Sequence, residues 1–318
     1  MEKIKNQHGF ALNVHDVVHR YGDRKALDGL CLQVNRSELF ALLGPNGCGK
    51  STLFRLISTL VPLQQGEIEV FGNSVRHDQR LVRGRLGIVF QSPSLDPKLT
   101  VRENLWCGSV LYGCDRRQFE RRLAEVTEQL GVEDRLHDPV EELSGGLKRR
   151  VELAKAIFHR PRLLLMDEPS TGLDPAARLD LWRALRQLQV QQRITIVLTT
   201  HLLDEADRAD RIAIMDRGQV RAVGSPGKLR QELGHQVLVL RPALAEIRTW
   251  LAEREIDATE ADGELRITGN DVANLVPALA ANFGRQIEQM SVGQPGLEDV
   301  FVAKTGHRYW ADTTSVPA

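Results

Sequence analysis

The sequence predicts an α/β fold built on a parallel β-sheet, followed by a smaller C-terminal α+β domain. Short apolar runs at residues 38–44, 160–169 and 193–201 are typical of buried strands, and helical patterns lie between them. Continuous apolar strands that alternate with helices indicate a parallel sheet covered on both faces. A second series of strand and helix patterns begins after residue 229 and predicts the smaller domain.

The bulk composition limits the class of protein. With 318 residues, the chain is long enough to form one large and one small domain, each with its own core. Lys and Arg together number 42 and so do Asp and Glu, which leaves a formal net charge of zero. The charge balance therefore gives no general reason to expect nucleic-acid binding.

The cysteines and the lengths of the apolar runs predict the cellular location of the protein. The four cysteines form no CxxC pair and have no histidine at metal-ligand spacing, so we expect a reduced cytoplasmic setting and no zinc site. The N-terminal stretch lacks the apolar centre of a signal peptide. No run of about 18 apolar residues occurs, and a role at the membrane would therefore require a partner.

The first apolar strand leads into a glycine-rich loop and then a helix. The strand ELFALLG spans residues 38–44, and the helical pattern KSTLFRLISTL ends at Pro62. Between them GPNGCGKST fits the P-loop pattern G-x-x-x-x-G-K-[ST] in full. Glycines let backbone amides close around phosphates, Lys50 reaches the β and γ oxygens, and the Ser51 hydroxyl can ligate Mg²⁺. The predicted phosphate-binding residues are Gly44, Pro45, Asn46, Gly47, Cys48, Gly49, Lys50, Ser51 and Thr52.

Residues 100–160 are almost wholly helical in pattern and predict a helical subdomain, at about 95–155, inserted into the sheet domain. Two capping-box spacings occur, one in TVRE at residues 100–103 and one between Asp115 and Gln118. The apolar face and the closing glycine of the second helix are Phe119, Leu123, Val126, Leu130 and Gly131.

The stretch LSGGLKRR, residues 143–150, forms a second candidate anion site. A Ser-Gly-Gly sequence at the start of a helix leaves backbone N–H groups uncovered, and such a helix end favours negative charge. Three basic residues follow in the same stretch. The sequence therefore predicts two phosphate-binding stretches, and the residues alone leave the ligand of the second one open.

An acidic pair ends the strand LLLMDE at residues 163–168. The carboxyl end of a strand in an α/β sheet is where ligand groups are presented. There Asp167 suits the coordination shell of Mg²⁺, and Glu168 is a candidate to polarise an attacking water. Beside a P-loop, this pair favours a site that hydrolyses a nucleotide.

Residues 235–306 predict a compact C-terminal accessory domain. A strand at VLVL is followed by a helix at 243–254, a hairpin with an Asp-Gly turn at 262–263, and a helix at 271–283. A last strand at QIEQMSV completes the order β-α-β-β-α-β, which is that of a ferredoxin-like module. This domain carries no cluster of catalytic residue types. Residues 307–318 are predicted to form a flexible tail.

Five motifs together carry a resemblance to a known family. The P-loop, LSGGLKRR, LLLMDEP, STGLD and TTH occur in an order and spacing that resemble the nucleotide-binding subunit of an ATP-binding cassette (ABC) transporter. The resemblance covers roughly residues 12–222 and implies a P-loop NTPase domain of ABC type within residues 1–228. That domain would contain a parallel sheet core, an antiparallel β subdomain and the inserted helical subdomain. The implied activity is ATP hydrolysis, with ATP and Mg²⁺ as the bound cofactors.

The resemblance also implies roles for individual residues. Tyr21 would stack on adenine, Gln91 would lie near Mg²⁺ and the γ-phosphate, and His201 would contact the γ-phosphate. The implied catalytic residues are Lys50, Gln91, Glu168 and His201. The implied metal ligands are Ser51, Gln91 and Asp167. The signature residues implied to contact the nucleotide are Ser144, Gly145 and Gly146. Asp174 is implied to contact the second subunit.

One position departs from the pattern of the family. Its members usually have Gln after the two glycines of the signature, and this chain has Leu147 there. Leu147 is in phase with Val151, Ala154 and Phe158 on one helix face, so packing explains it. Because the serine and both glycines are intact, we expect ATPase activity to survive.

The resemblance implies two protein partners. In this family the signature of one subunit covers the nucleotide held by the P-loop of the other, and this chain has one of each. We therefore expect a two-fold homodimer. The stretches QSPSLDPKLTVREN and PGLEDVFVAKTG are similar to sequences in ATPases of the drug-resistance (daunorubicin-type) exporter group. Such ATPases work with a separate polytopic permease, so the protein is expected at the cytoplasmic face of the cell membrane, as a peripheral subunit.

Two alternatives from other classes stay open. A soluble ATPase of the translation-factor kind uses the same cassette, usually as two cassettes in one chain, and this chain has one. A DNA-maintenance ATPase would separate its P-loop from its signature by a long coiled coil, and here fewer than a hundred residues lie between them. Transport is therefore the favoured function, and no nucleic acid is expected as a partner.

Overall fold

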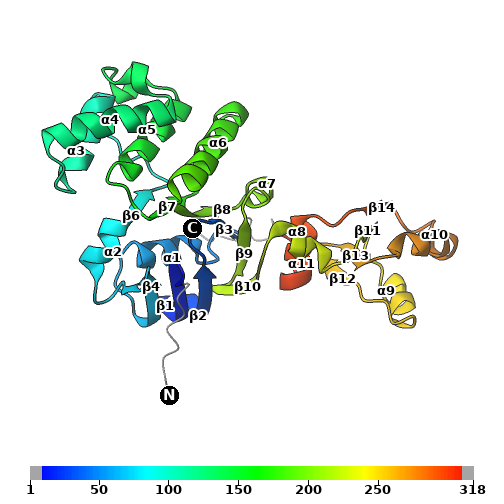
Figure 1. Ribbon diagram of the computed structural model, residues 1–318. Coiled ribbons are helices and arrows are strands. Elements are labelled where there is room, and N and C mark those ends of the chain that lie inside the picture. The colour runs from blue at the N-terminus through cyan, green and yellow to red at the C-terminus, as the bar shows by residue number, and fades with distance from the viewer. Residues whose placement is uncertain (1–8, 310–318) are drawn as a thin grey trace. The chain divides into compact units, whose positions relative to one another are not determined.

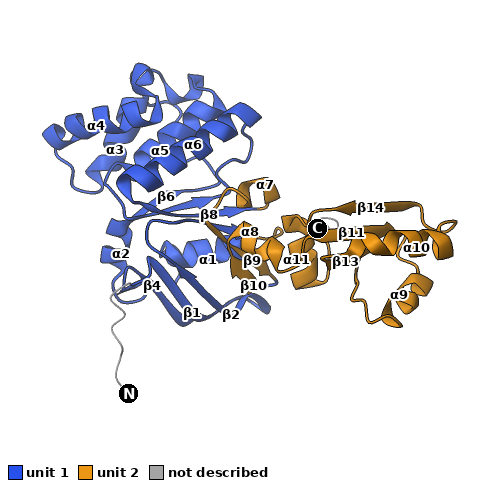
Figure 2. Ribbon diagram, turned by 45° about the vertical axis from the view of Figure 1, so that its right-hand side comes forward, with its two compact units in different colours: residues 1–42, 49–200, 217–219 blue, residues 43–48, 201–216, 220–318 orange. Residues whose placement is uncertain are grey.

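The computed structural model describes residues 9–309, which divide into two compact units (Figure 1; Figure 2). Each unit consists of several segments, so the chain passes between them more than once. Within the described range, unit 1 contains the residues up to 42, 49–200 and 217–219, and unit 2 contains 43–48, 201–216 and the residues from 220 onward.

Unit 1 begins with an antiparallel sheet in which the strand order is β2-β1-β4-β5. Its strands are β1 (Leu12–Tyr21), β2 (Arg24–Val34), β4 (Gln65–Val70) and β5 (Asn73–Ser74). Along β1, the buried residues Leu12, Val14 and Val17 are interspersed with more exposed ones, as in a sheet with one covered face. The predicted antiparallel subdomain is confirmed.

A second group of strands in unit 1 forms the predicted parallel sheet. β6 (Leu86–Val89), β7 (Leu163–Asp167) and β8 (Thr195–Thr200) pair in parallel. β3 (Leu39–Leu43) lies next to β8 and is buried along its whole length. All three apolar runs that predicted buried strands are therefore strands of one sheet.

The first helix of unit 1 is shorter than predicted. It ends at Ile57 and does not continue to Pro62. Thr59 has a left-handed φ of 61°, and the N–H groups of Thr59 and Leu60 donate to carbonyls of the last helical turn at 3.1 and 3.0 Å. This pair of bonds is a Schellman motif, which closes a helix. The helices around the sheet strands are α1 (Lys50–Ile57), α2 (Gln79–Arg85) and α6 (Pro175–Gln192).

Between β6 and β7 lie α3 (Val101–Val110), α4 (Arg116–Leu130) and α5 (Gly145–Ile157), which pack on one another (Figure 1). Both predicted capping boxes are present, at Thr100 and at Asp115. The predicted apolar face of α4 is buried, and Gly131 ends this helix at a left-handed φ of 62°. Short 3-10 helices at Glu133–Arg135 and Val140–Glu142 connect α4 to α5.

Unit 2 contains a pair of neighbouring strands, β9 (Arg211–Asp216) and β10 (Gln219–Gly224). The short helix α7 (Leu203–Ala206) precedes them, and α8 (Pro226–Gln231) leads into the C-terminal region. Across both units, no described helix is both long enough and apolar enough to cross a membrane.

The C-terminal region of unit 2 has the predicted β-α-β-β-α-β order. Its sheet order is β12-β13-β11-β14 with every pair antiparallel, which is a ferredoxin-like arrangement. The hairpin turns at Asp262 and Gly263, where positive φ angles of 56° and 74° fit a tight hairpin turn. The elements are β11 (Gln236–Arg241), α9 (Ala245–Ala252), β12 (Thr259–Ala261), β13 (Glu264–Gly269), a 3-10 helix (Val272–Leu275), α10 (Val276–Phe283) and β14 (Gln289–Gly293).

The chain beyond the last strand ends in a helix. It forms α11 (Leu297–Thr305), and Tyr309 packs its ring edge-on against Phe301 at 4.8 Å. Tyr309 is only 1% exposed. Tyr309 lies within the first three residues of the flexible tail predicted from residue 307. The rest of that predicted tail, residues 310–318, lies outside the described residues.

Candidate functional site

The P-loop lies between β3 and α1, and its backbone contains two left-handed glycines. Gly47 has φ of 81° and Gly49 has φ of 108°, conformations that residues with a side chain rarely adopt. Gly49 is also the N-cap of α1, which begins at Lys50. A glycine-rich turn that leads into a helix N-terminus presents backbone amides and the positive end of the helix dipole, an arrangement that binds phosphate.

Close packing explains the outer two of the three P-loop glycines. A Cβ atom on Gly44 would lie 2.5 Å from the carbonyl oxygen of Met215, and a Cβ atom on Gly49 would lie 2.6 Å from the carbonyl oxygen of Ala26. Both separations are shorter than a Cβ atom tolerates against backbone, so any side chain would displace the loop. Lys50, which follows Gly49, is itself only 4% exposed.

A threonine of the neighbouring strand holds the acidic pair at the end of β7. Thr199 lies opposite Asp167 in the parallel pairing of β7 and β8. Its hydroxyl donates to the Asp167 carboxylate at 2.5 Å and accepts the backbone N–H of Glu168 at 2.9 Å. Thr199 is a site residue that the motifs did not predict, although its place at the end of a neighbouring apolar strand was a usable signal.

The structure brings Gln91 and Glu168 together. Glu168 adopts a left-handed φ of 45°, an uncommon conformation for a residue with a long side chain. The Gln91 amide and the Thr171 hydroxyl each donate to the same oxygen of the Glu168 carboxylate, both at 3.4 Å. Gln91 follows β6, which pairs with β7, so the parallel sheet places these two side chains side by side.

The signature stretch forms the N-terminus of α5. Ser144 is the N-cap, and its Oγ accepts the backbone N–H of Leu147 at 3.3 Å. A Cβ atom on Gly146 would lie 2.9 Å from the Cβ atom of Ala177, so close packing against α6 favours glycine there. Leu147 is half-buried, whereas Val151, with which it was predicted to be in phase, is fully buried.

The remaining predicted residues lie at the ends of elements. Asp174 is the N-cap of α6, where its carboxylate accepts the backbone N–H of Ala177 at 2.9 Å. Tyr21 ends β1 and is 45% exposed, with its ring 4.8 Å from that of His19. His201 directly follows β8 and belongs to unit 2, whereas Glu168 and Gln91 belong to unit 1.

A buried ion pair on α5 holds the segment that carries Gln91. Arg149 and Glu152 are 2.7 Å apart, with side chains only 8% and 5% exposed. Arg149 also donates to the carbonyl of Phe90 at 3.0 Å, and Glu152 accepts the backbone N–H of Ser94 at 2.8 Å. The backbone on both sides of Gln91 is therefore bonded to the signature helix. No local pattern predicts this role of the pair, because the backbone groups that it binds lie about sixty positions away in the sequence.

Lys155 adds a third contact from α5 to the same segment. Its ammonium donates to the carbonyl of Ser94 at 2.7 Å. Burial lowers the pKa of Lys155, because desolvation disfavours the charged form. Ser94 is thus held through both its N–H and its carbonyl, which fixes where the chain runs after Gln91.

The residues predicted to bind metal have the donor atoms that Mg²⁺ prefers. Ser51, Gln91 and Asp167 offer hydroxyl, amide and carboxylate oxygens. Within residues 9–309, no group of three or more His, Cys, Asp or Glu side chains could hold a metal ion. Mg²⁺ is usually held by one or two carboxylates together with substrate phosphates, so the single carboxylate of Asp167 is enough for an ion that a nucleotide also holds.

Comparison with known proteins places this geometry in a family. The family described as ABC transporter matches residues 27–171. The chain is 37% identical over 305 residues to the daunorubicin resistance ATP-binding protein DrrA3 of Streptomyces coeruleorubidus, an alignment that covers 93% of this chain and 96% of that protein. It is 39% identical over 299 residues to the Nod factor export ATP-binding protein I of Rhizobium etli, with 93% of each chain covered.

Solved structures agree with these sequence relatives. The cbiO1 protein of Clostridium perfringens, described as part of the ABC transporter complex cbiONQ, matches with a TM-score of 0.66 and 30% identity. That match covers 70% of this chain and 91% of cbiO1. The ADP conformation of MJ1267, an ATP-binding cassette of an ABC transporter, matches with a TM-score of 0.64 and 26% identity, covering 69% of this chain and 92% of MJ1267.

The ion pair on α5 gives a test of stability. Replacing Glu152 by Ala leaves the Arg149 guanidinium buried without its carboxylate and removes the partner of the Ser94 N–H. We expect a loss of about 3 kcal/mol, because an unpaired buried charge is costly. Urea unfolding followed by circular dichroism measures it.

The matched control removes a glutamate from an exposed ion pair. Glu141 lies 2.9 Å from Lys98, and these side chains are 48% and 77% exposed. Glu141→Ala should change the free energy of unfolding by less than about 1 kcal/mol, because water screens such pairs. Equal effects of Glu152→Ala and Glu141→Ala would contradict the role given to the buried pair.

Proposed function

Because the chain belongs to the ATP-binding proteins of the ABC transporter family, we propose that it energises export through a separate membrane permease. As a member of this family it binds ATP and hydrolyses it for transport. The observation that carries the export proposal is that the likeness to the resistance and export proteins runs over more than nine tenths of the chain. We assign the ATPase domain to residues 1–228 and the accessory domain to residues 235–306.

The catalytic step that we assign to Glu168 is polarisation of the water that attacks the γ-phosphate. Three contacts support this role. Gln91 and Thr171 both donate to its carboxylate, and the Thr199 hydroxyl holds its backbone N–H. The carboxylate is thus positioned before the nucleotide arrives, which is how a general base gains its efficiency.

The phosphates and Mg²⁺ are assigned to the residues that the sequence singled out. Lys50 would contact the β and γ oxygens of ATP, and the backbone amides of the P-loop would surround the phosphates. Mg²⁺, when bound, neutralises charge on the phosphates. Thr199 directs the Asp167 carboxylate through its hydroxyl, so that this carboxylate is held at the strand end. The residues assigned to Mg²⁺ are Ser51, Gln91 and Asp167.

The signature is assigned to the nucleotide of a second copy of the chain. As the N-cap of α5, Ser144 accepts a backbone N–H, and its own hydroxyl hydrogen remains to donate to a phosphate oxygen. The amides of Gly145 and Gly146 lie in the first helical turn, where the helix dipole favours an anion. Because the chain has one P-loop and one signature, two copies in a two-fold dimer would complete two sites.

Three more residues belong to the proposed composite site. Tyr21 is assigned to adenine, and its exposed ring can stack on a planar base. His201 is assigned to the γ-phosphate. Asp174 is assigned to the contact between the two copies, and its bond to the first turn of α6 fixes the orientation of its carboxylate.

A separate polytopic permease is the proposed membrane partner, which would place the protein at the cytoplasmic face of the membrane. Purification from membranes of cells that express a tagged chain tests this assignment. We expect one protein with several long apolar segments to co-purify in stoichiometric amount. Stable association with ribosomes or with DNA in place of such a protein would contradict transport.

Substitution of Glu168 by Gln tests the catalytic assignment. The variant should bind ATP, lose roughly a hundredfold or more of its turnover, and accumulate dimers, because the side chain keeps its size but loses its basicity. Phosphate release and size-exclusion chromatography measure both effects. Glu67→Gln, on an exposed position of β4, is the control and should hydrolyse ATP normally. Normal turnover of Glu168→Gln would refute the assignment.

Mixing two inactive variants tests the composite site. Ser144→Arg blocks the signature and Lys50→Ala disables the P-loop, so each homodimer should be inactive. In a mixed dimer the P-loop of the first variant faces the signature of the second, and one site is intact. We therefore expect partial recovery of ATPase activity on mixing. Activity that stays at the level of the separate variants would argue that the signature does not act across the dimer.

A further inference from the structure

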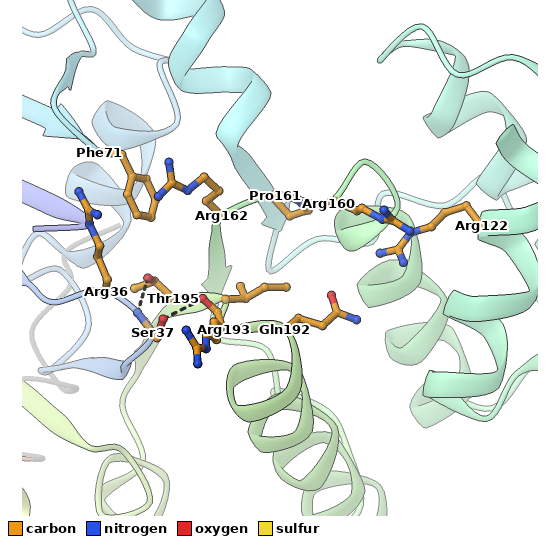
Figure 3. Close-up of a pocket in the computed structure, with 11 residues that line it drawn as sticks. Arg36, Ser37, Phe71, Arg122, Arg160, Pro161, Arg162, Gln192, Arg193 and Thr195 are labelled. Carbon is orange, nitrogen blue, oxygen red and sulfur yellow. Dashed lines mark hydrogen bonds between the residues drawn. The ribbon is translucent and has the colours of Figure 1, made fainter.

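A hollow of about 670 Å³ in unit 1 has a strongly basic lining (Figure 3). Its lining includes no aspartate and no glutamate, although the whole chain has equal numbers of acidic and basic residues. We call it the arginine hollow. Its five arginines are Arg36, Arg122, Arg160, Arg162 and Arg193.

The arginine hollow lies at the amino ends of neighbouring strands. Arg36 shortly precedes β3, Arg162 directly precedes β7, and Arg193 shortly precedes β8. Ser37 fixes the chain there, since its N–H donates to the Thr195 hydroxyl and its own hydroxyl donates to the Arg193 carbonyl, both at 2.9 Å. The acidic pair of the nucleotide site lies at the other end of β7, so this is a separate place in the fold.

Two of the five arginines already have partners. Arg122 and Arg160 both bind the Glu125 carboxylate, at 2.8 and 3.0 Å. Arg122 also donates to the carbonyls of Ile157 and Phe158 at the end of α5. These two side chains shape one side of the hollow, and the single Glu125 carboxylate compensates half of their charge.

The other three arginines form a positive cluster without a carboxylate. Within residues 9–309, no acidic side chain forms an ion pair with Arg36, Arg162 or Arg193. The guanidinium carbon of Arg162 lies 4.2 Å from the centre of the Phe71 ring and that of Arg36 lies 5.7 Å from it (Figure 3). The ring thus gathers two cations at one site.

A further arginine adds to this positive field. Arg85 donates to the Phe71 carbonyl at 3.0 Å. Desolvation, and then repulsion by Arg85 and Arg36, lower the pKa of Arg162. Like charges held together by the fold repel one another, and a bound anion would relieve that repulsion.

We propose that the arginine hollow binds a small molecule that carries at least two phosphate groups. A guanidinium group can donate two parallel hydrogen bonds to two oxygens of one phosphate, so arginine recognises both the charge and the shape of a phosphate group. One phosphate monoester carries about two negative charges at most, so two phosphates match three uncompensated arginines. A single phosphate would leave most of the volume empty, and the apolar surfaces of Pro161 and Ile194 can accept an organic part.

Calorimetric titration with pyrophosphate tests the proposal. Saturating MgADP fills the nucleotide site first, so that the probe reports only on a second site. We expect one pyrophosphate per chain, with an affinity that falls as salt is raised. The double variant Arg36→Gln/Arg162→Gln should bind about tenfold more weakly or worse, because two charge-assisted contacts are lost. Its ATPase activity should match that of the unchanged protein.

The matched control removes two arginines outside the hollow. Arg117 and Arg121 are exposed residues of α4, so Arg117→Gln/Arg121→Gln lowers the net charge equally. This control should keep full pyrophosphate affinity, and circular dichroism checks that both variants fold. Equal weakening by both variants, or no binding to the unchanged protein at millimolar pyrophosphate, would overturn the proposal.

A second experiment, vesicle flotation, distinguishes a soluble ligand from a lipid headgroup. Flotation with phosphatidylglycerol vesicles, against phosphatidylcholine vesicles, measures membrane binding. We expect the Arg36→Gln/Arg162→Gln variant to float as the unchanged protein does. Loss of phosphatidylglycerol binding in this variant, together with no pyrophosphate binding to the unchanged protein, would overturn the soluble ligand in favour of a headgroup.

Discussion

In the candidate nucleotide site, the contacts around Asp167 and Glu168 depend on the parallel pairing of β6, β7 and β8 in unit 1. That pairing sets Thr199 opposite Asp167 and brings the chain that follows β6 beside the end of β7. Gln91 and Glu168, far apart in the sequence, then share a hydrogen bond. A shift of β7 by a single residue would turn its side chains, Asp167 among them, to the opposite face. The pairing register therefore decides which side chains meet at this end of the sheet.

The signature helix α5 connects two residues to which we assign contacts with nucleotide, Ser144 and Gln91. Its N-terminus carries Ser144, and its next turns carry the ion pair that binds the backbone around Gln91. A nucleotide that moves Gln91 would therefore act on the same helix that we assign to the nucleotide of a second copy. Coupling of this kind needs a physical connection between two sites. Here the connection consists of the buried Arg149–Glu152 ion pair and hydrogen bonds of 2.7 to 3.0 Å to the backbone of Phe90 and Ser94.

The parallel strands of unit 1 separate two kinds of charge. Carboxylates lie at the carboxyl end of β7, and arginines gather at the amino ends of β7 and β8. A strand of five residues is roughly 16 Å long, which exceeds the Debye length of about 8 Å at physiological ionic strength. Solvent-exposed charges at the two ends therefore interact weakly. Net neutrality of the whole chain therefore conceals local regions of strong charge.

The sequence by itself determined the features that depend on near neighbours. The P-loop glycines, the capping boxes at Thr100 and Asp115, the end of α4 at Gly131 and the Asp-Gly hairpin were all predictable, because each is set by residues within a few positions. The order of apolar strands and helices likewise predicted the sheet and the ferredoxin-like module. Only the tertiary structure decided that Thr199 orients the acidic pair, that Arg149 and Glu152 hold the Gln91 segment, that Tyr309 is buried and that arginines from separate segments share one hollow. Those features depend on contacts between residues distant in the chain, which a local pattern does not encode.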